Sequence, residues 1–354
     1  MTGDSHDATD LPPAEPRATG PTDPRGSEND PITRRAEGPL RHALARRLVL
    51  GTDADPDLAA RRFLAAAPSH GIDPSLMWGA FDPAHPDHPL EVCLAVIGTG
   101  RTATLFLGPE DTAAGRTADE RHAARVAAAR AAIDHLSTER AGEVTLIQAL
   151  PSPDETSTIA ALESAGLRRI AELDYLRRDA RRRIEPVPPE QWPAGVSPDR
   201  LDLLGPPEAW TDDLLDTLDR SYRDTLDCPE LCGLRDTRDV LASHRAVGRW
   251  NPSLWWLLRL DGRPAGCALL NPSPEQDSIE LVYLGLTPEA RGKGLAALLL
   301  RHAIARARTQ PARWITCAVD RRNAPARKLY ANAGFEPFTE RTALVRAVAR
   351  PATD

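Results

Sequence analysis

The stretch from Leu281 to Leu300, LVYLGLTPEARGKGLAALLL, combines a strand, a turn and a helix. Its first six residues are mostly apolar, as in a buried strand, and Thr287-Pro288 interrupts them. The run from Leu295 has the apolar spacing of an amphipathic helix, and the basic loop R-G-K-G lies between the two. The stretch therefore predicts a strand that turns through a glycine loop directly into a helix.

The glycine loop has the composition of an anion site. Gly292 and Gly294 permit backbone conformations closed to other residues, so consecutive N–H groups can converge at the positive end of the helix. A diphosphate fits such a nest, and Arg291 and Lys293 can add charge at its rim. The spacings of nucleoside-triphosphate and dinucleotide loops are absent. A flexible turn between strand and helix is the alternative interpretation of R-G-K-G alone.

A second motif, N-x-x-A-x-x-L-Y-x-x-x-G-F at 323–335, follows L-x-L-T-P-x-x-R-G-x-G-L-A at 284–296. Together they resemble the signature of the GNAT superfamily of acyl-CoA-dependent N-acyltransferases, over roughly residues 200–348. The resemblance implies that acetyl-CoA, the acyl donor, lies in a V-shaped split between two parallel strands. A strand bulge would direct a backbone N–H at the thioester carbonyl, and Gly285 is where such a distortion is tolerated.

The same resemblance places the diphosphate on the glycine loop and the pantetheine along the strand before it. The implied coenzyme-binding residues are Leu284, Gly285, Leu286, Arg291, Gly292, Lys293, Gly294, Leu295, Ala296 and Asn323. For Asn323, a helix N-cap is an equal alternative.

Direct attack of a primary amine on the thioester needs a neutral amine, a stabilised oxyanion and a proton for the thiolate. Glu280 lies where many family members carry a glutamate base, with a solvated strand-edge charge as the alternative. Tyr330 matches the tyrosine that often protonates the thiolate in the family, although a tyrosine packed under the coenzyme would look the same. The candidate acceptor residues, or else ordinary surface charges, are Asp227, Glu230 and Arg235.

The chain also contains an internal repeat. Residues 142–178 superimpose without a gap on 310–346 at an offset of 168, and both halves follow the same order of strands and helices. At that offset the first half has Leu162 in place of Tyr330, and its loop lacks paired glycines. We therefore expect an α+β fold of two tandem GNAT-like domains, each a mixed, mostly antiparallel twisted sheet flanked by helices, with the first domain degenerate.

Composition sets the expected boundaries. A polar, Pro- and Gly-rich start predicts a disordered tail, and a second Pro-rich stretch predicts a linker between two domains. The expected segments are a tail at 1–38, a degenerate domain at 39–183, a linker at 184–199, an acetyl-CoA-binding domain at 200–348 and a tail at 349–354.

The 354 residues carry a net charge of −7, which argues against nucleic acid as a partner. No run approaches the roughly 20 apolar residues of a membrane span. Five scattered cysteines without a signal segment favour a reducing cytoplasm, and no metal site is expected. The expected function is N-acetyl transfer from acetyl-CoA to a small-molecule or peptide amine, with a non-catalytic acyl-CoA-binding sensor or scaffold as the alternative. The acceptor's identity, acyl length and oligomeric state stay open.

Overall fold

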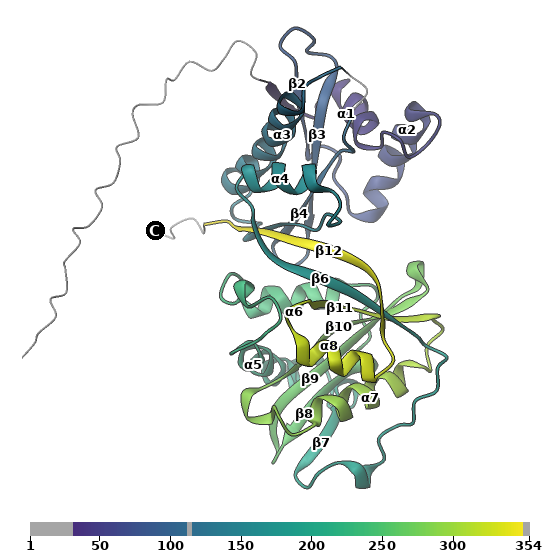
Figure 1. The fold of residues 1–354 in the computed structure, drawn as a ribbon. Helices are drawn as coiled ribbons and strands as arrows, with labels where there is room; N and C mark the ends of the chain where they lie inside the picture. Colours follow the sequence, from purple (N-terminus) through teal and green to yellow (C-terminus); the bar gives the residue numbers. More distant parts are fainter. Residues whose placement is uncertain (1–30, 112–114, 350–354) are drawn as a thin grey trace, which may run out of the picture.

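The computed structural model describes residues 31–111 and 115–349, and its halves repeat one order of elements (Figure 1). The first half contains β1 (Ile32–Arg35), α1 (Leu40–Leu48), α2 (Pro56–Ala66), β2 (Met77–Phe81), β3 (Pro89–Gly98), β4 (Thr102–Leu107), α3 (Ala118–Thr138), β5 (Leu146–Ala149), α4 (Thr156–Ser164) and β6 (Arg168–Asp179). The second half contains β7 (Val196–Arg200), α5 (Thr211–Ser221), α6 (Thr237–Ala246), β8 (Trp255–Leu260), β9 (Arg263–Ser273), β10 (Ser278–Leu286), α7 (Leu295–Ala307), β11 (Trp314–Asp320), α8 (Ala324–Asn332) and β12 (Glu336–Ala347).

The internal repeat predicted from the sequence is confirmed. At an offset of 168 residues, α4 coincides with α8 and β6 coincides with β12 at both ends, and β5 begins where β11 begins. The repeated strand, helix and strand complete each unit. The chain is therefore a tandem of two α+β units.

The twelve strands of residues 31–111 and 115–349 form one sheet, in the order β1-β2-β3-β4-β5-β12-β6-β11-β10-β9-β8-β7. The units exchange their last strands, because β12 pairs with β5 of the first half and β6 pairs with β11 of the second half. β6 and β12 also pair with each other, and Figure 1 shows them crossing together between the two halves. Among the described strands, β4–β5 and β10–β11 are the parallel pairs, so each unit is mixed and mostly antiparallel as expected. The sequence did not predict the exchange that joins the units.

Two of the expected boundaries need correction. The tail expected at 1–38 contains β1, which pairs with β2, so a strand lies before residue 39. The linker expected at 184–199 contains most of β7, which pairs with β8. Residues 1–30 and 350–354 of the two expected tails lie outside the described residues.

The strand exchange also means that the halves are not separable at the linker. β6 provides the edge partner of β11, and β12 provides the edge partner of β5. A cut within 184–199 would place β5 and its partner β12 on different fragments, and likewise β11 and its partner β6.

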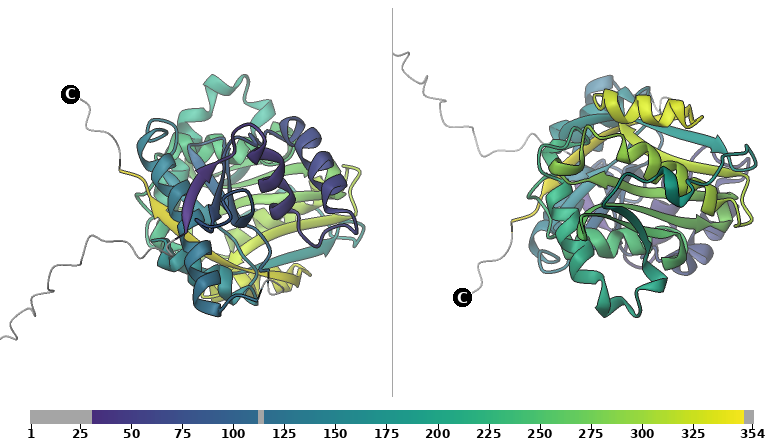
Figure 2. Two further views of the ribbon diagram at one scale, coloured as in Figure 1. Left: turned by 90° about the horizontal axis from the view of Figure 1, so that it is seen from above. Right: turned by 90° about the horizontal axis from the view of Figure 1, so that it is seen from below.

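Apolar side chains cover both faces of the sheet in the second half. The core on one face includes Leu281 of β10 and Leu299 of α7. The core on the other face includes Leu214 of α5, Leu241 of α6 and Leu269 of β9. The right view of Figure 2 shows α8 and the α5–α6 region on opposite sides of the strands. Successive residues of β10 therefore face two different environments.

Within 31–111 and 115–349, no helix combines the length and apolar character needed to cross a bilayer.

Candidate active site

A cleft opens in the second half where β10 and β11 separate. The strands pair only from Ser278 to Glu280, opposite Trp314 to Thr316, although both continue further. The facing edges beyond Glu280 are unpaired, and a cleft of about 530 Å³ lies there. The parallel split implied by the resemblance is present. The candidate residues that line the cleft are Asp227, Leu284, Gly285, Leu286, Arg291, Gly292, Gly294, Ala296, Asn323 and Tyr330.

The bulge in β10 lies at Val282 and not at Gly285, where the sequence suggested it. The pairing register with β9 skips one residue between Leu281 and Tyr283, so Val282 is the extra residue, and it lines the cleft. Gly285 has a different role, because a Cβ built there would lie 2.5 Å from the Tyr283 hydroxyl oxygen. The glycine makes room for that tyrosine, whose hydroxyl lies 2.7 Å from the Ser221 hydroxyl.

The glycine loop forms a row of free N–H groups at the start of α7. Gly292 and Gly294 both have φ of +74°, in the left-handed region. The N–H groups from Gly292 to Ala296 donate to no acceptor in the described part of the chain, and α7 has neither a side-chain cap nor an acidic residue in its first turn. Lys293 is exposed, whereas the Leu295 side chain is buried in the core. Leu295 therefore offers its backbone alone to this site.

The Arg291 side chain binds backbone carbonyl groups and does not extend to the rim of the glycine loop. Its guanidinium donates to the carbonyl oxygens of Leu286 at 3.1 Å, Ser221 at 2.8 Å and Asp224 at 3.2 Å. The side chain thereby ties the end of β10 to the end of α5 and the loop after it. The rim charge expected from the Arg291 side chain is thus replaced by a positioning role.

Tyr330 and Glu280 approach the split from opposite faces of the sheet. Tyr330 lines the cleft, and its hydroxyl has no hydrogen-bond partner among the described residues. Burial raises the pKa of Tyr330 well above its ordinary value, and nearby negative charge adds to the shift. Glu280 lies at the last paired position before the split, outside the residues that line the cleft, and burial raises the pKa of its carboxyl group.

Among the other candidates, Asp227 and Asn323 line the cleft and also hold it together. Asp227 Oδ1 accepts from the backbone N–H of Asp320 at 2.8 Å. Asn323 is the N-cap of α8, so the capping alternative is correct, and its Oδ1 accepts from a first-turn N–H at 3.2 Å. Glu230 does not reach the cleft, because it forms an ion pair with Arg322 at 2.7 Å. Its expected contact with the acceptor is therefore not supported.

Arg235 also lies away from the cleft, and it latches α6 onto the first half. Its guanidinium donates to the carbonyl of Gly100, in the β3–β4 turn, at 2.7 Å and to the Asp239 carbonyl at 3.1 Å. The Ser243 hydroxyl, which also accepts from Arg235, lies 3.0 Å from the Thr99 carbonyl. The β3–β4 turn of the first half therefore fixes the position of α6 and of the loop before it. The spacing of residues in the sequence could not show this role of Arg235.

This contact can be tested with two glycines that both have a left-handed φ, Gly100 at +80° and Gly71 at +69°. A Cβ at Gly100 would clash with the Asp239 carbonyl and the Ser243 hydroxyl, whereas a Cβ at Gly71 would have no heavy atom within 4 Å. We expect Gly100→Ala to lower the free energy of unfolding by about 1–3 kcal/mol more than Gly71→Ala in urea titrations, as overpacking does. Gly71→Ala is the control, because it introduces the same kind of backbone strain without the clash. Equal stabilities of the two variants would contradict the latch.

The corresponding helix start in the first half is capped by side chains and carries negative charge. α3 begins with a capping box, in which the Thr117 N–H donates to Glu120 at 2.8 Å and the Glu120 N–H donates to the Thr117 hydroxyl at 3.3 Å. Asp119 and Glu120 also place negative charge in its first turn. An opening of about 740 Å³ nearby includes the carboxylates Glu110 and Glu155 in its lining. None of these features favours a diphosphate.

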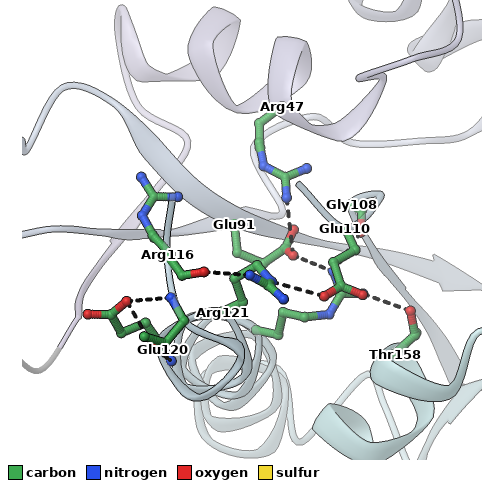
Figure 3. A network of polar contacts seen from close by, with 10 residues as sticks. Arg47, Glu91, Gly108, Glu110, Arg116, Glu120, Arg121 and Thr158 are labelled. Atoms are coloured by element: carbon green, nitrogen blue, oxygen red, sulfur yellow. Dashed lines mark hydrogen bonds and ion pairs between the residues drawn. The ribbon is translucent and has the colours of Figure 1, made fainter. Parts of the chain in front are cut away.

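A buried ion cluster crosses the equivalent split in the first half (Figure 3). Arg125 of α3 donates to the Glu91 carboxylate at 2.6 Å, to the Gly108 carbonyl after β4 at 3.1 Å and to the Thr158 hydroxyl of α4 at 2.7 Å. Arg47 adds a second ion pair to Glu91 at 3.3 Å. β4 and α4 correspond to β10 and α8, so Arg125 joins the elements that the second half leaves apart.

The family comparison agrees with this geometry. Residues 215–335 match the model of the acetyltransferase (GNAT) family. The mycothiol acetyltransferase of Beutenbergia cavernae is 30% identical over 190 residues, which are 49% of this chain and 58% of that protein. The chain thus spans a little over half the length of this curated relative.

Solved structures show the fold over nearly the whole chain. A GCN5-related N-acetyltransferase from Sphaerobacter thermophilus has a TM-score of 0.56 at 17% identity, covering 92% of this chain and 98% of that one. A fungal GCN5-related glucosamine N-acetyltransferase region, within a multi-domain GH3 beta-N-acetylglucosaminidase, has a TM-score of 0.54 at 16% identity. It covers 90% of this chain and 38% of that one. The likeness extends through both halves, in agreement with the tandem.

Proposed function

We propose that this chain transfers an acetyl group from acetyl-CoA to a primary amine. The observation that carries the proposal is the row of free N–H groups at Gly292 to Ala296, beside an open split that is lined by the free Tyr330 hydroxyl. The family of residues 215–335 uses acetyl-CoA as its acyl donor, and the curated relative is named as an acetyltransferase. Both support acetyl transfer.

The second half offers a complete set of groups for the donor. The free N–H groups and the positive end of α7 suit a diphosphate, and exposed Lys293 adds a cation near it. Leu284 and Leu286 line the cleft beside the unpaired edge of β10, where the pantetheine amides would find backbone partners. The bulge at Val282 frees backbone groups from the ladder, which suits polarisation of the thioester carbonyl.

The proposed reaction uses one proton acceptor and one proton donor. Glu280, through water, takes the proton that the ammonium must lose, and the amine nitrogen then attacks the thioester carbon. A C–N bond forms, and the C–S bond breaks with its electron pair on sulfur. Tyr330 donates its hydroxyl proton to the thiolate. The raised pKa values of both groups fit these roles, because Glu280 becomes a stronger base and Tyr330 stays protonated.

The acceptor is proposed to be a small-molecule or peptide amine. Of the three candidate acceptor residues, Asp227 alone lines the cleft. Its carboxylate could contact a cationic amine, whereas Glu230 and Arg235 hold the surrounding segment in place.

A thiol-release assay with acetyl-CoA and a panel of primary amines tests this function beside calorimetric titration of the coenzyme. We expect binding to the full chain and turnover with at least one amine. Binding without turnover on any amine would favour the sensor or scaffold, and no binding would contradict the proposed site altogether.

A further inference from the structure

The strand exchange places residues of the first half directly beside the proposed base. Glu280 on β10 is opposite Thr316 on β11, and Thr316 is opposite Arg177 on β6. Directly paired residues share one face of a sheet, so these three side chains form a row across three strands. Two strand spacings separate the Cα atoms of the outer pair, about 10 Å. This row lies on the face opposite Tyr330.

The Arg177 side chain is packed between two aromatic rings and forms no ion pair among the described residues. Its guanidinium carbon lies 4.5 Å from the Trp314 ring centroid and 5.3 Å from that of Phe338. Two aromatic rings restrict an arginine while leaving its N–H donors available. Within the described residues Arg177 makes no ion pair, and Glu336, directly opposite it on β12, is not within ion-pairing distance. The side chain is exposed and so can meet a ligand.

Two further groups on this face extend the polar surface from the row. Tyr175 on β6 is paired with Ala318, which lines the cleft, and its hydroxyl has no partner among the described residues. Arg341 on β12 is opposite Leu173 on β6. Its guanidinium donates to the Thr339 hydroxyl at 3.0 Å and makes no ion pair within the part of the chain that the structure describes. A phenol and two guanidinium groups thus lie on the same face of the sheet as the proposed base.

We propose that the exchange face, formed by Tyr175, Arg177 and Arg341, binds a carboxylate of the acceptor whose amine reaches Glu280. This inference rests on the proposed function and names its substrate class as a carboxylate-bearing amine. Arginine forks pair with carboxylates through two parallel hydrogen bonds, and the face continues from the base to the mouth of the cleft. The first half then contributes to specificity through β6 although it carries no comparable nest.

Two matched acceptors, glycylglycine and glycylglycinamide, test the proposal on the full chain. They differ in the carboxylate alone. We expect the parent chain to favour glycylglycine by about 10-fold or more in kcat/KM, the scale of a charge-assisted hydrogen bond. In Arg177→Gln the KM for glycylglycine should rise by about that factor. The KM for glycylglycinamide, both kcat values and the Kd of acetyl-CoA should stay unchanged.

Arg168→Gln is the charge control, because Arg168 is also exposed on β6 and makes no ion pair in the described chain, but lies at the strand's opposite end. It should keep the preference for glycylglycine. The assignment of this face would be overturned if the parent showed no preference for glycylglycine, or if Arg177→Gln kept that preference unchanged. Acetylation of only those amines that lack a carboxylate would overturn it as well. Failure of the parent on every amine would overturn the proposed function itself and this inference with it.

Discussion

Tyr330→Phe should lower turnover about 100-fold at every pH at which the parent chain works, because the leaving thiolate loses its proton donor. The pKa of Tyr330 is raised well above its ordinary value by burial, so the phenol stays protonated across that range. The coenzyme Kd should change little, since the hydroxyl makes no hydrogen bond within the described residues. Tyr222→Phe is the matched control, because its buried hydroxyl also lacks a partner there and does not line the cleft. Steady-state rates over pH measure the effect.

Glu280→Gln should give a different profile. Burial raises the pKa of Glu280, so the parent rate should rise with pH as the carboxylate forms, above the ordinary range for glutamate. The variant should lose about 100-fold near neutral pH and recover as pH approaches the pKa of the amine, where the free amine needs no base. Glu275→Gln, on the exposed turn before β10, is the control.

The shapes of the two profiles separate these roles. If both variants give the parent profile scaled by less than about threefold, neither residue carries the proton. The coenzyme site could then still be correct, with water or the acceptor itself as the proton carrier.

The double variant Gly292→Val and Gly294→Val should weaken acetyl-CoA binding by about 100-fold, because side chains at left-handed φ cost roughly 1–2 kcal/mol each and the loop must leave the conformation that gathers its N–H groups. No heavy atom lies within 4 Å of a Cβ built at either position, so we expect the fold to be retained. Calorimetric titration gives the Kd, and circular dichroism checks the fold.

Gly262→Val separates backbone strain from loss of the site. Gly262 has the same φ of +74° and the same open space, but it lies in the β8–β9 turn away from the cleft. It should lose stability without losing coenzyme affinity. Unchanged titration in the double variant would contradict the glycine-loop site.

The repeat and the glycine loop were predictable because both depend on local sequence. Paired glycines before an apolar helix have a direct backbone meaning, and the offset of 168 follows from aligning the chain with itself. The strand exchange was not predictable, because the apolar alternation of β6 and β12 fixes which side chains face the core but not which strand lies alongside.

Charged residues were the least predictable. The local sequence is compatible with a ligand site at Arg291, Glu230 and Arg235. In the structure, however, Arg291 binds backbone carbonyls, Glu230 pairs with an arginine, and Arg235 binds the first half. Arg125 gave no signal in its alanine-rich helix, because its partner Glu91 lies on a separate strand. Such roles depend on long-range contacts that a single sequence does not display.

A crystal structure of the full chain with saturating acetyl-CoA tests the central claim most directly. We expect the coenzyme in the split between β10 and β11, with its diphosphate within hydrogen-bond distance of the N–H groups from Gly292 to Ala296. The equivalent split in the first half should keep its Arg125–Glu91 ion pair. Coenzyme bound across Arg125 in the first half, or an empty second cleft at saturation, would contradict this account.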